Sequence, residues 1–163
     1  MTRILYEATR VPRKVPLPRF ERSCGVVIVN DDPSAGREYL LLHYPTGHWD
    51  FAKGHVEKDE EDLATALREA REETGLADLQ VLHNFKHEFE YWYRHHQTPI
   101  RKHVTWFLAK AETKLVKISH EHQGYEWLPY TRAIERVTYA NAKDLLRRAE
   151  EFLKANPAQK AFF

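Results

Sequence analysis

Short apolar runs separated by polar loops recur along the chain, a pattern typical of a packed sheet. The runs CGVVIV at 24–29 and YLLLHY at 39–44 are apolar at nearly every position, which predicts two strands buried on both faces. Apolar side chains fall mainly on odd positions along 81–93, and this alternation predicts one half-buried strand. The polar stretch RHHQTPIRK then leads into an apolar run at 103–110, which should pair back onto that strand as a hairpin. The segment YEWLPY at 125–130 predicts a last short strand.

Helical spacing appears in two further segments. Apolar side chains three and four residues apart predict a helix over 60–74, with Asp59 as its N-cap and Gly75 as its stop. A second helix is expected over 141–156, with Asn141 as its cap and a proline just past its end. The side chains expected to face the core on the first helix are Leu63, Leu67 and Ala70.

Strands and helices interspersed around one sheet predict an α/β fold, an α/β sandwich with a mixed sheet. This domain is expected to span residues 20–156, after a basic, proline-containing arm at 1–19 and before a short tail at 157–163. In the last strand, the alternating side chains of Tyr125 and Trp127 are expected to lie in the core.

Composition narrows the classes of function that fit. With 163 residues, 42% hydrophobic and 30% charged, the chain suits one soluble domain, which we expect to be a monomer. A net charge of +1 gives no bulk attraction to nucleic acid or membrane. No apolar run approaches the roughly 18 residues of a membrane-spanning helix, and the first residues lack the apolar block of a signal peptide, which predicts a cytoplasmic protein. The only cysteine, Cys24, excludes an intramolecular disulfide and a thiolate metal cluster.

Three glutamates gather near the C-terminal end of the predicted 60–74 helix, where the helix dipole disfavours negative charge. Glu69, Glu72 and Glu73 are spaced i, i+3 and i+4, so they crowd one face of that helix. Repulsion and the dipole together make this arrangement unfavourable by roughly 1–3 kcal/mol. A divalent cation would turn the repulsion into attraction, and carboxylate oxygens suit Mg²⁺ or Mn²⁺ better than Zn²⁺. The cluster therefore predicts a metal site, against the alternative of a solvated acidic face.

The ten histidines raise a second metal-binding hypothesis. His95 and His96 are adjacent in the sequence. His120 and His122 alternate along a strand-like segment. Neither pair has the three- or four-residue spacing of zinc ligands on a helix, so both pairs are predicted to be exposed or hydrogen-bonded side chains.

The segment GHVEKDEEDLATALREAREETGL at 54–76 fills every defined position of the Nudix box. That box is glycine, five residues, glutamate, seven residues, and then Arg-Glu-aliphatic-any-Glu-Glu-any-Gly-aliphatic. Because nine positions are defined over 23 residues, chance agreement is improbable and the chain resembles the Nudix hydrolase family. The resemblance implies a Nudix-type α/β/α sandwich with a mixed sheet between helices, and hydrolysis of a diphosphate linked to another moiety.

The same resemblance assigns roles to residues of the box. The positions that bind divalent metal or activate water in the family match Glu69, Glu72 and Glu73. The main-chain carbonyl that matches Gly54 often joins the metal shell. Arg68 is expected to pair with Glu60 and steady the loop, which is a structural role. Which glutamate is the general base, and how many metal ions bind, stays open at this point.

Segments outside the box are similar to the asymmetrical diadenosine tetraphosphate hydrolases, which split their substrate into ATP and AMP. These segments are HWDFAKGHVE, FKHEFEYWY and SHEHQGYEWL. Positive groups are needed to grip an anionic polyphosphate, and the phosphate-contacting positions of that subfamily match His48, Lys53 and Lys102. An additional metal ligand or base matches Glu121. The aromatic positions that sandwich an adenine match Tyr91 and Tyr139, and each stack would contribute about 1–3 kcal/mol.

The chain departs from that subfamily at Ala52, where members commonly carry proline. The exchange is expected to loosen the loop before Lys53 by up to about 1 kcal/mol through chain entropy, without removing a charged group.

Hydrolysis of diadenosine tetraphosphate and related nucleoside polyphosphates, with Mg²⁺ as cofactor and Mn²⁺ as a possible substitute, is the function we expect. The same chemistry on triphosphorylated or capped RNA 5′ ends, or on diphosphoinositol polyphosphates, would favour a more basic surface than a net charge of +1 provides. Removal of oxidised nucleoside triphosphates would need a pocket for one base rather than stacking rings. A non-catalytic, nucleotide-sensing Nudix module would usually have an eroded box, and this box is intact.

Overall fold

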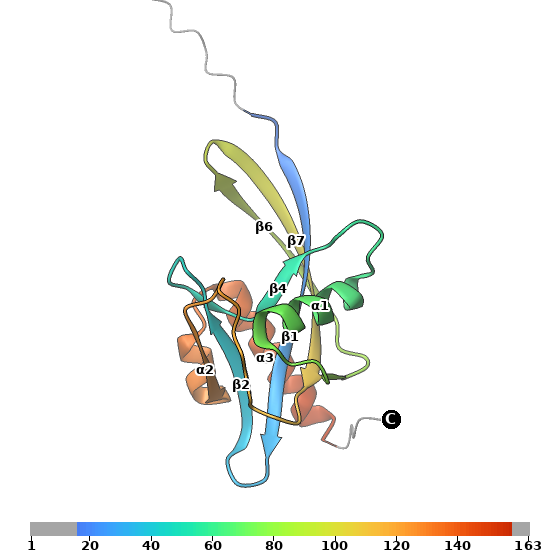
Figure 1. Cartoon of the computed structure of the whole chain (residues 1–163), viewed down its shortest axis with the longest axis vertical. Coiled ribbons are helices and arrows are strands. Elements are labelled where there is room, and N and C mark those ends of the chain that lie inside the picture. The colour runs from blue at the N-terminus through green and yellow to red at the C-terminus, as the bar shows by residue number, and fades with distance from the viewer. Residues whose placement is uncertain (1–15, 158–163) are drawn as a thin grey trace, which may run out of the picture.

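The structure is a computed structural model that describes residues 16–157, so most of the predicted arm at 1–19 and of the tail at 157–163 lies outside the described residues. In chain order the elements are β1 (Arg19–Asp32), β2 (Gly36–His43), β3 (Trp49–Asp50), β4 (Ala52–His55), α1 (Asp62–Thr74), β5 (Gln80–Val81), β6 (His87–His95), β7 (Thr98–Lys110), β8 (Gly124–Pro129), α2 (Tyr130–Arg136) and α3 (Ala140–Ala155). Figure 1 shows a sheet with helices packed around it. Within the described range, every helix is too short or too polar to cross a membrane.

The strands join one mixed sheet, as predicted. β1 runs parallel to β7, and this pairing forms the centre of the sheet. β2 and β4 pair antiparallel with β1, β3 and β8 pair antiparallel with β2, and β5 and β6 pair antiparallel with β7. Because β4 and β6 flank the same central pair, residues from distant parts of the sequence meet there.

Both faces of β1 are buried, as its continuous apolar run predicts. Val27 and Val29 face a core shared with α2 and α3, which we call the α3-side core. Val26 and Ile28 face a second core that includes Ala70 of α1, which we call the α1-side core. Successive side chains of an extended strand point to opposite faces, so β1 contributes side chains to both cores. The sandwich of helices around a mixed sheet is therefore confirmed.

The single strand predicted at 81–93 is wrong in its first half. β5 ends, the chain turns through Asn84, whose φ of 69° is left-handed, and β6 then begins. The break turns Leu82 and Phe85 into the α3-side core. β6 keeps the alternation of half-buried and exposed side chains and pairs with β7 as the predicted hairpin. Figure 1 shows this hairpin extending past the helices together with the start of β1.

The start of α1 also differs from the prediction. Glu61 occupies the N-cap position, and Asp59 has a left-handed φ of 62°, so the predicted Asp59 cap is wrong. The end of the helix is as predicted, because Gly75 has a φ of 73° and its N–H donates to the Arg71 carbonyl. The helix thus stops directly after the glutamate cluster.

The buried face of α1 matches the predicted stripe of Leu63, Leu67 and Ala70 only at Ala70. Leu63 and Leu67 are only half-buried, whereas Ala66 and Ala70 are fully buried and Glu73 is 4% exposed. Small side chains let the helix approach β1 and β4 closely, and this close approach outweighs the larger apolar area that the leucines would bury. As a result, the last turns of α1 carry Glu73 toward the sheet rather than toward solvent.

Features near the C-terminus differ in three places. The sequence did not predict α2, which is a short helix directly after β8. In α3, Tyr139 is the N-cap, and Asn141 lies inside the first turn, where its Oδ1 accepts a hydrogen bond from the Ala142 N–H. The predicted Asn141 cap is therefore wrong. Tyr125 is 40% exposed instead of buried, whereas Trp127 packs against the α1-side core as predicted.

Candidate active site

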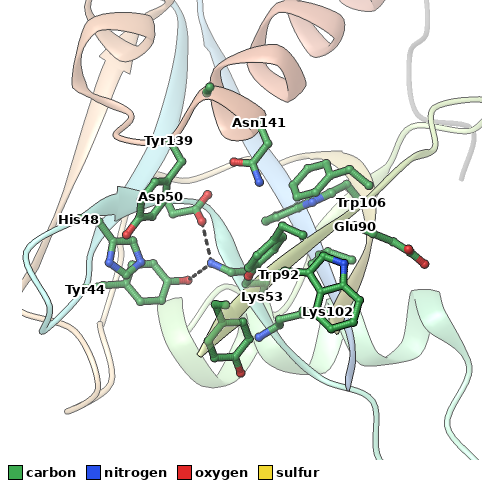
Figure 2. Close-up of a pocket in the computed structure, with 15 residues that line it drawn as sticks. Tyr44, His48, Asp50, Lys53, Glu90, Trp92, Lys102, Trp106, Tyr139 and Asn141 are labelled. Atoms are coloured by element: carbon green, nitrogen blue, oxygen red, sulfur yellow. Dashed lines mark hydrogen bonds and ion pairs between the residues drawn. The ribbon is translucent and has the colours of Figure 1, made fainter. Parts of the chain in front are cut away.

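A cavity of about 810 Å³ opens between the β6–β7 hairpin, the β3–β4 segment and the start of α3 (Figure 2). Its lining residues are Tyr44, His48, Asp50, Lys53, Phe89, Glu90, Tyr91, Trp92, Tyr93, Lys102, Val104, Trp106, Tyr139, Ala140 and Asn141. The five residues predicted to contact substrate outside the box are all among them. They come from segments as distant as β4 and α3, and the pairing of β1 with both β4 and β7 brings them together.

Lys53 is fixed by its neighbours although the chain lacks the proline before it. Ala52 pairs with Val26 of β1 and is buried, so the segment before Lys53 is a strand rather than a loose loop. The Lys53 ammonium lies 2.7 Å from Asp50 Oδ2 and 3.4 Å from the Tyr44 hydroxyl (Figure 2). Strand pairing and the ion pair therefore hold this segment and Lys53 in place, so the loosening expected at Ala52 is not seen.

Lys102 is the second lysine of the cavity. Burial lowers the pKa of its ammonium, and the neighbouring charge of Lys53 lowers it further. The carboxylates of Glu21 and Asp50 raise this pKa, but they do not cancel the effect of burial. An anionic ligand would stabilise the charged form of this partly buried ammonium. The lysine side of the cavity is therefore suited to phosphate.

Aromatic rings form other walls of the cavity. Tyr139 is 50% exposed, and its ring centroid lies 5.2 Å from that of His48, which stacks on Tyr44 at 4.6 Å. Tyr91 is half-buried in β6 and lies directly opposite Lys102 of β7. Burial lowers the pKa of His48 and raises that of Tyr91, which favours the uncharged form of each ring. Neutral planar rings offer contact area to a nucleobase.

Arg68 forms hydrogen bonds with three glutamates of the box, Glu60, Glu69 and Glu72. Its Nε and Nη2 lie 2.8 and 3.0 Å from the Glu60 carboxylate, so the ion pair implied by the resemblance is present. Hydrogen bonding to Arg68 lowers the pKa of Glu60 to about 2. The same guanidinium donates from Nη1 to Glu69 at 2.8 Å and to Glu72 at 3.2 Å. One positive group thus offsets the repulsion among several carboxylates.

Glu69 lies directly against Gly54. A Cβ on residue 54 would overlap the Glu69 carboxylate, so only glycine leaves room for that side chain. Burial raises the pKa of Glu69, and the charges of Glu73 and Glu72 raise it further, against the opposing effect of Arg68. A cation at this place would relieve the cost of ionising the carboxyl group.

Glu73 is the most enclosed of the three glutamates, with its side chain 5% exposed. Its Oε2 accepts a hydrogen bond from the Lys53 backbone N–H at 3.1 Å, and its Oε1 lies 3.3 Å from His122 Nε2. The prediction for His122 is wrong, because the ring is buried and neither ring nitrogen has a hydrogen-bond partner within residues 16–157. His95, His96 and His120 are exposed as predicted.

The structure does not bring Glu121 into the glutamate cluster. Its side chain is exposed, and its backbone N–H donates to the Ser119 hydroxyl in a tight turn. In the described part of the chain, no three His, Cys, Asp or Glu side chains stand close enough together to hold a metal ion as they are placed here. The donor chemistry still fits a hard divalent cation, because Glu69 and Glu72 share one guanidinium that a cation would replace.

Comparison with known proteins gives consistent matches over most of the chain. The sequence profile of the NUDIX domain matches residues 19–150. The chain is 37% identical over 148 residues to the asymmetrical bis(5′-nucleosyl)-tetraphosphatase of Mus musculus, covering 84% of this chain and 98% of that protein. It is 36% identical over 137 residues to the enzyme of the same name from Caenorhabditis elegans, covering 81% and 96%. The crystal structure of a C. elegans Ap4A hydrolase binary complex is similar in fold, with a TM-score of 0.73 and 32% identity, covering 83% of this chain and 98% of that one.

Proposed function

Because this chain belongs to the Nudix family, we propose that it is a hydrolase that splits diadenosine tetraphosphate and related nucleoside polyphosphates into ATP and AMP. The observation that carries the proposal is the cavity, where two lysines and a histidine lie among aromatic rings. Lys53 connects this cavity to the glutamate cluster, since its ammonium lines the cavity and its backbone N–H binds Glu73. A polyphosphate gripped by the lysines would therefore lie next to the carboxylates.

We assign the binding of a divalent cation, Mg²⁺ or Mn²⁺, to Glu69, Glu72 and Glu73, with the Gly54 carbonyl beside them. When bound, such an ion supplies a water of lowered pKa and neutralises phosphate oxygens. Glu121 would join the site only after a movement of its exposed turn. The chemistry of hard oxygen donors and the room that Gly54 leaves for Glu69 support the assignment.

The side chains of the cavity have separate tasks in this proposal. His48, Lys53 and Lys102 bind the phosphates and stabilise the negative charge that develops during in-line attack. Tyr91 and Tyr139 stack on an adenine and set the distance from the base to the phosphorus that is attacked. The aromatic walls exclude water from the bound base, which strengthens the contacts of the lysines with phosphate.

The experiment that tests this function is incubation with diadenosine tetraphosphate, triphosphorylated RNA and inositol pyrophosphates, each with and without Mg²⁺, followed by chromatography. We expect ATP and AMP in equal amounts from the dinucleotide, only when the metal is present. Release of two ADP molecules would contradict the asymmetrical cleavage. Faster turnover of the RNA or of the inositol pyrophosphate would move the proposal to that substrate class.

Two further properties belong to the same proposal. We propose that the protein acts as a monomer in the cytoplasm on a small molecule. A net charge of +1 offers little to a polyanionic partner surface.

Tyr139→Ala should raise KM for diadenosine tetraphosphate by about 5- to 150-fold, because one base stack contributes roughly 1–3 kcal/mol. The ring is half exposed and outside the core, so the fold should not change. Steady-state kinetics measures the effect, and Tyr125→Ala is the matched control, since Tyr125 is also exposed but does not line the cavity. An unchanged KM in Tyr139→Ala would exclude base stacking on this ring.

A further inference from the structure

His122 is a buried imidazole without an evident structural task. Its side chain is 1% exposed, and neither ring nitrogen makes a hydrogen bond within the described residues. Buried polar groups in folded proteins are nearly always hydrogen-bonded, because an unpaired one loses its contacts with water and gains nothing in return. An unpaired imidazole in the interior therefore points to a role in function.

A carboxylate of the glutamate cluster lies close to this ring. His122 Nε2 lies 3.3 Å from Glu73 Oε1, while the other carboxylate oxygen of Glu73 accepts the Lys53 N–H. The separation is within hydrogen-bond reach, so a rotation of the ring that aligned an Nε2–H with Oε1 would form the bond. The Glu73 carboxylate would then be gripped at both oxygens by donors from two different segments.

Contacts with neighbouring residues hold the His122 ring and its loop close to Glu73. The Tyr44 ring contacts the imidazole edge to face, with centroids 4.5 Å apart and planes at 85°. The backbone N–H of Ser119 donates to the Glu73 carbonyl at 3.2 Å, and the His122 N–H donates to the Ser119 carbonyl at 3.2 Å. The loop that carries the histidine is therefore tied to the main chain of the same glutamate.

We propose that His122 is a positioning residue that orients the Glu73 carboxylate through an Nε2–H donor, a role that rests on the function proposed above. A carboxylate fixed at both oxygens presents its remaining lone pairs in one direction. His122 itself contacts neither substrate nor metal in this proposal. Its contribution is the fixed orientation of a ligand, which support of this kind commonly provides in metal sites.

Two substitutions of similar length separate this role from simple packing. His122→Gln keeps an N–H donor near the position of Nε2, whereas His122→Met fills the space without a donor. We expect His122→Gln to keep most of kcat and His122→Met to lose about 10- to 100-fold in kcat with little change in KM. His120→Gln is the matched control, because His120 is exposed and two residues away.

Binding of Mn²⁺ to the substrate-free protein, followed by electron paramagnetic resonance, gives a readout that does not depend on turnover. His122→Met should weaken Mn²⁺ binding by about 10- to 100-fold relative to His122→Gln. Equal kcat and equal Mn²⁺ affinity in the two variants would overturn the proposal. Wild-type protein that binds Mn²⁺ but hydrolyses no nucleoside polyphosphate would overturn the proposed function and leave the His122 comparison valid.

A measurement on correctly folded protein covers the case in which His122→Met does not fold. The imidazole nitrogen resonances of His122 should indicate a protonated Nε2 beside a carboxylate in the wild type. They should shift in Glu73→Gln, because the charged acceptor is gone. Resonances that are identical in the two proteins would overturn the proposal.

Discussion

Glu73→Gln should lower kcat by roughly 10²- to 10⁴-fold, the range in which removal of a group that activates water falls. The carboxylate is nearly isosteric with the amide, and the amide oxygen can still accept the Lys53 N–H that Oε2 accepts now. The fold and the cavity should therefore persist, while one negative charge is lost from the cation site. Initial rates with diadenosine tetraphosphate and Mg²⁺ measure the effect.

Glu135→Gln is the control for that substitution, since Glu135 is exposed on α2 and does not line the cavity. It should keep wild-type kcat and KM. If Glu73→Gln turned over as fast as this control, Glu73 would have no part in the metal and water chemistry.

Gly54→Ala should abolish most activity while leaving the protein folded. The new Cβ would overlap the Glu69 carboxylate, and a flexible side chain can give way where backbone could not. Displacing a carboxylate that we propose as a metal ligand should cost more than the about 10- to 100-fold loss caused by disturbing a group that only supports a ligand. Rates and Mn²⁺ affinity should fall together in this variant.

The stability of Gly54→Ala should stay within about 1 kcal/mol of wild type in its free energy of unfolding. Weakening the partly exposed pair of Glu69 with Arg68 costs little, and alanine in place of glycine restricts the unfolded chain. Gly124→Ala is the matched control, because no atom lies within 4 Å of a Cβ placed there. Full activity in Gly54→Ala would show that the place of Glu69 beside Gly54 is not needed.

The central layers of the fold could be predicted because their signals are local and repeated. The apolar run of β1 predicts burial on both faces, and the alternation along β6 predicts a strand with one half-buried face. The stop at Gly75 follows from the left-handed conformation that glycine adopts easily. These elements depend on side chains that lie next to one another in the sequence.

The missed features depend on distant contacts instead. The rotation of α1 that buries Ala66 and Glu73 follows from its close packing on β1 and β4, which no helical periodicity encodes. Asn84 interrupts a segment whose alternation continues on both sides, because Leu82 and Phe85 both turn into the α3-side core. Tertiary packing determines which helix face is buried and where a strand breaks, and it overrides the local preference of the sequence.

The candidate site shows the same division. The glutamates of the box could be found because their spacing is unfavourable without a cation. Nothing in the sequence predicts that Asp50 and Asn141 line the cavity, and the structure shows both among its lining residues (Figure 2). His122 was predicted to be exposed or hydrogen-bonded. Its burial against Glu73 depends on a loop whose position the sequence pattern does not predict.

Crystals grown with Mn²⁺ and measured at the manganese absorption edge test most directly whether the glutamates at the end of α1 hold a divalent cation. We predict an anomalous peak bound by carboxylate oxygens of Glu69 and Glu73 beside Gly54, with Arg68 withdrawn from Glu69. A map without a peak there, in which Arg68 still bridges Glu69 and Glu72 at saturating Mn²⁺, would contradict the assignment.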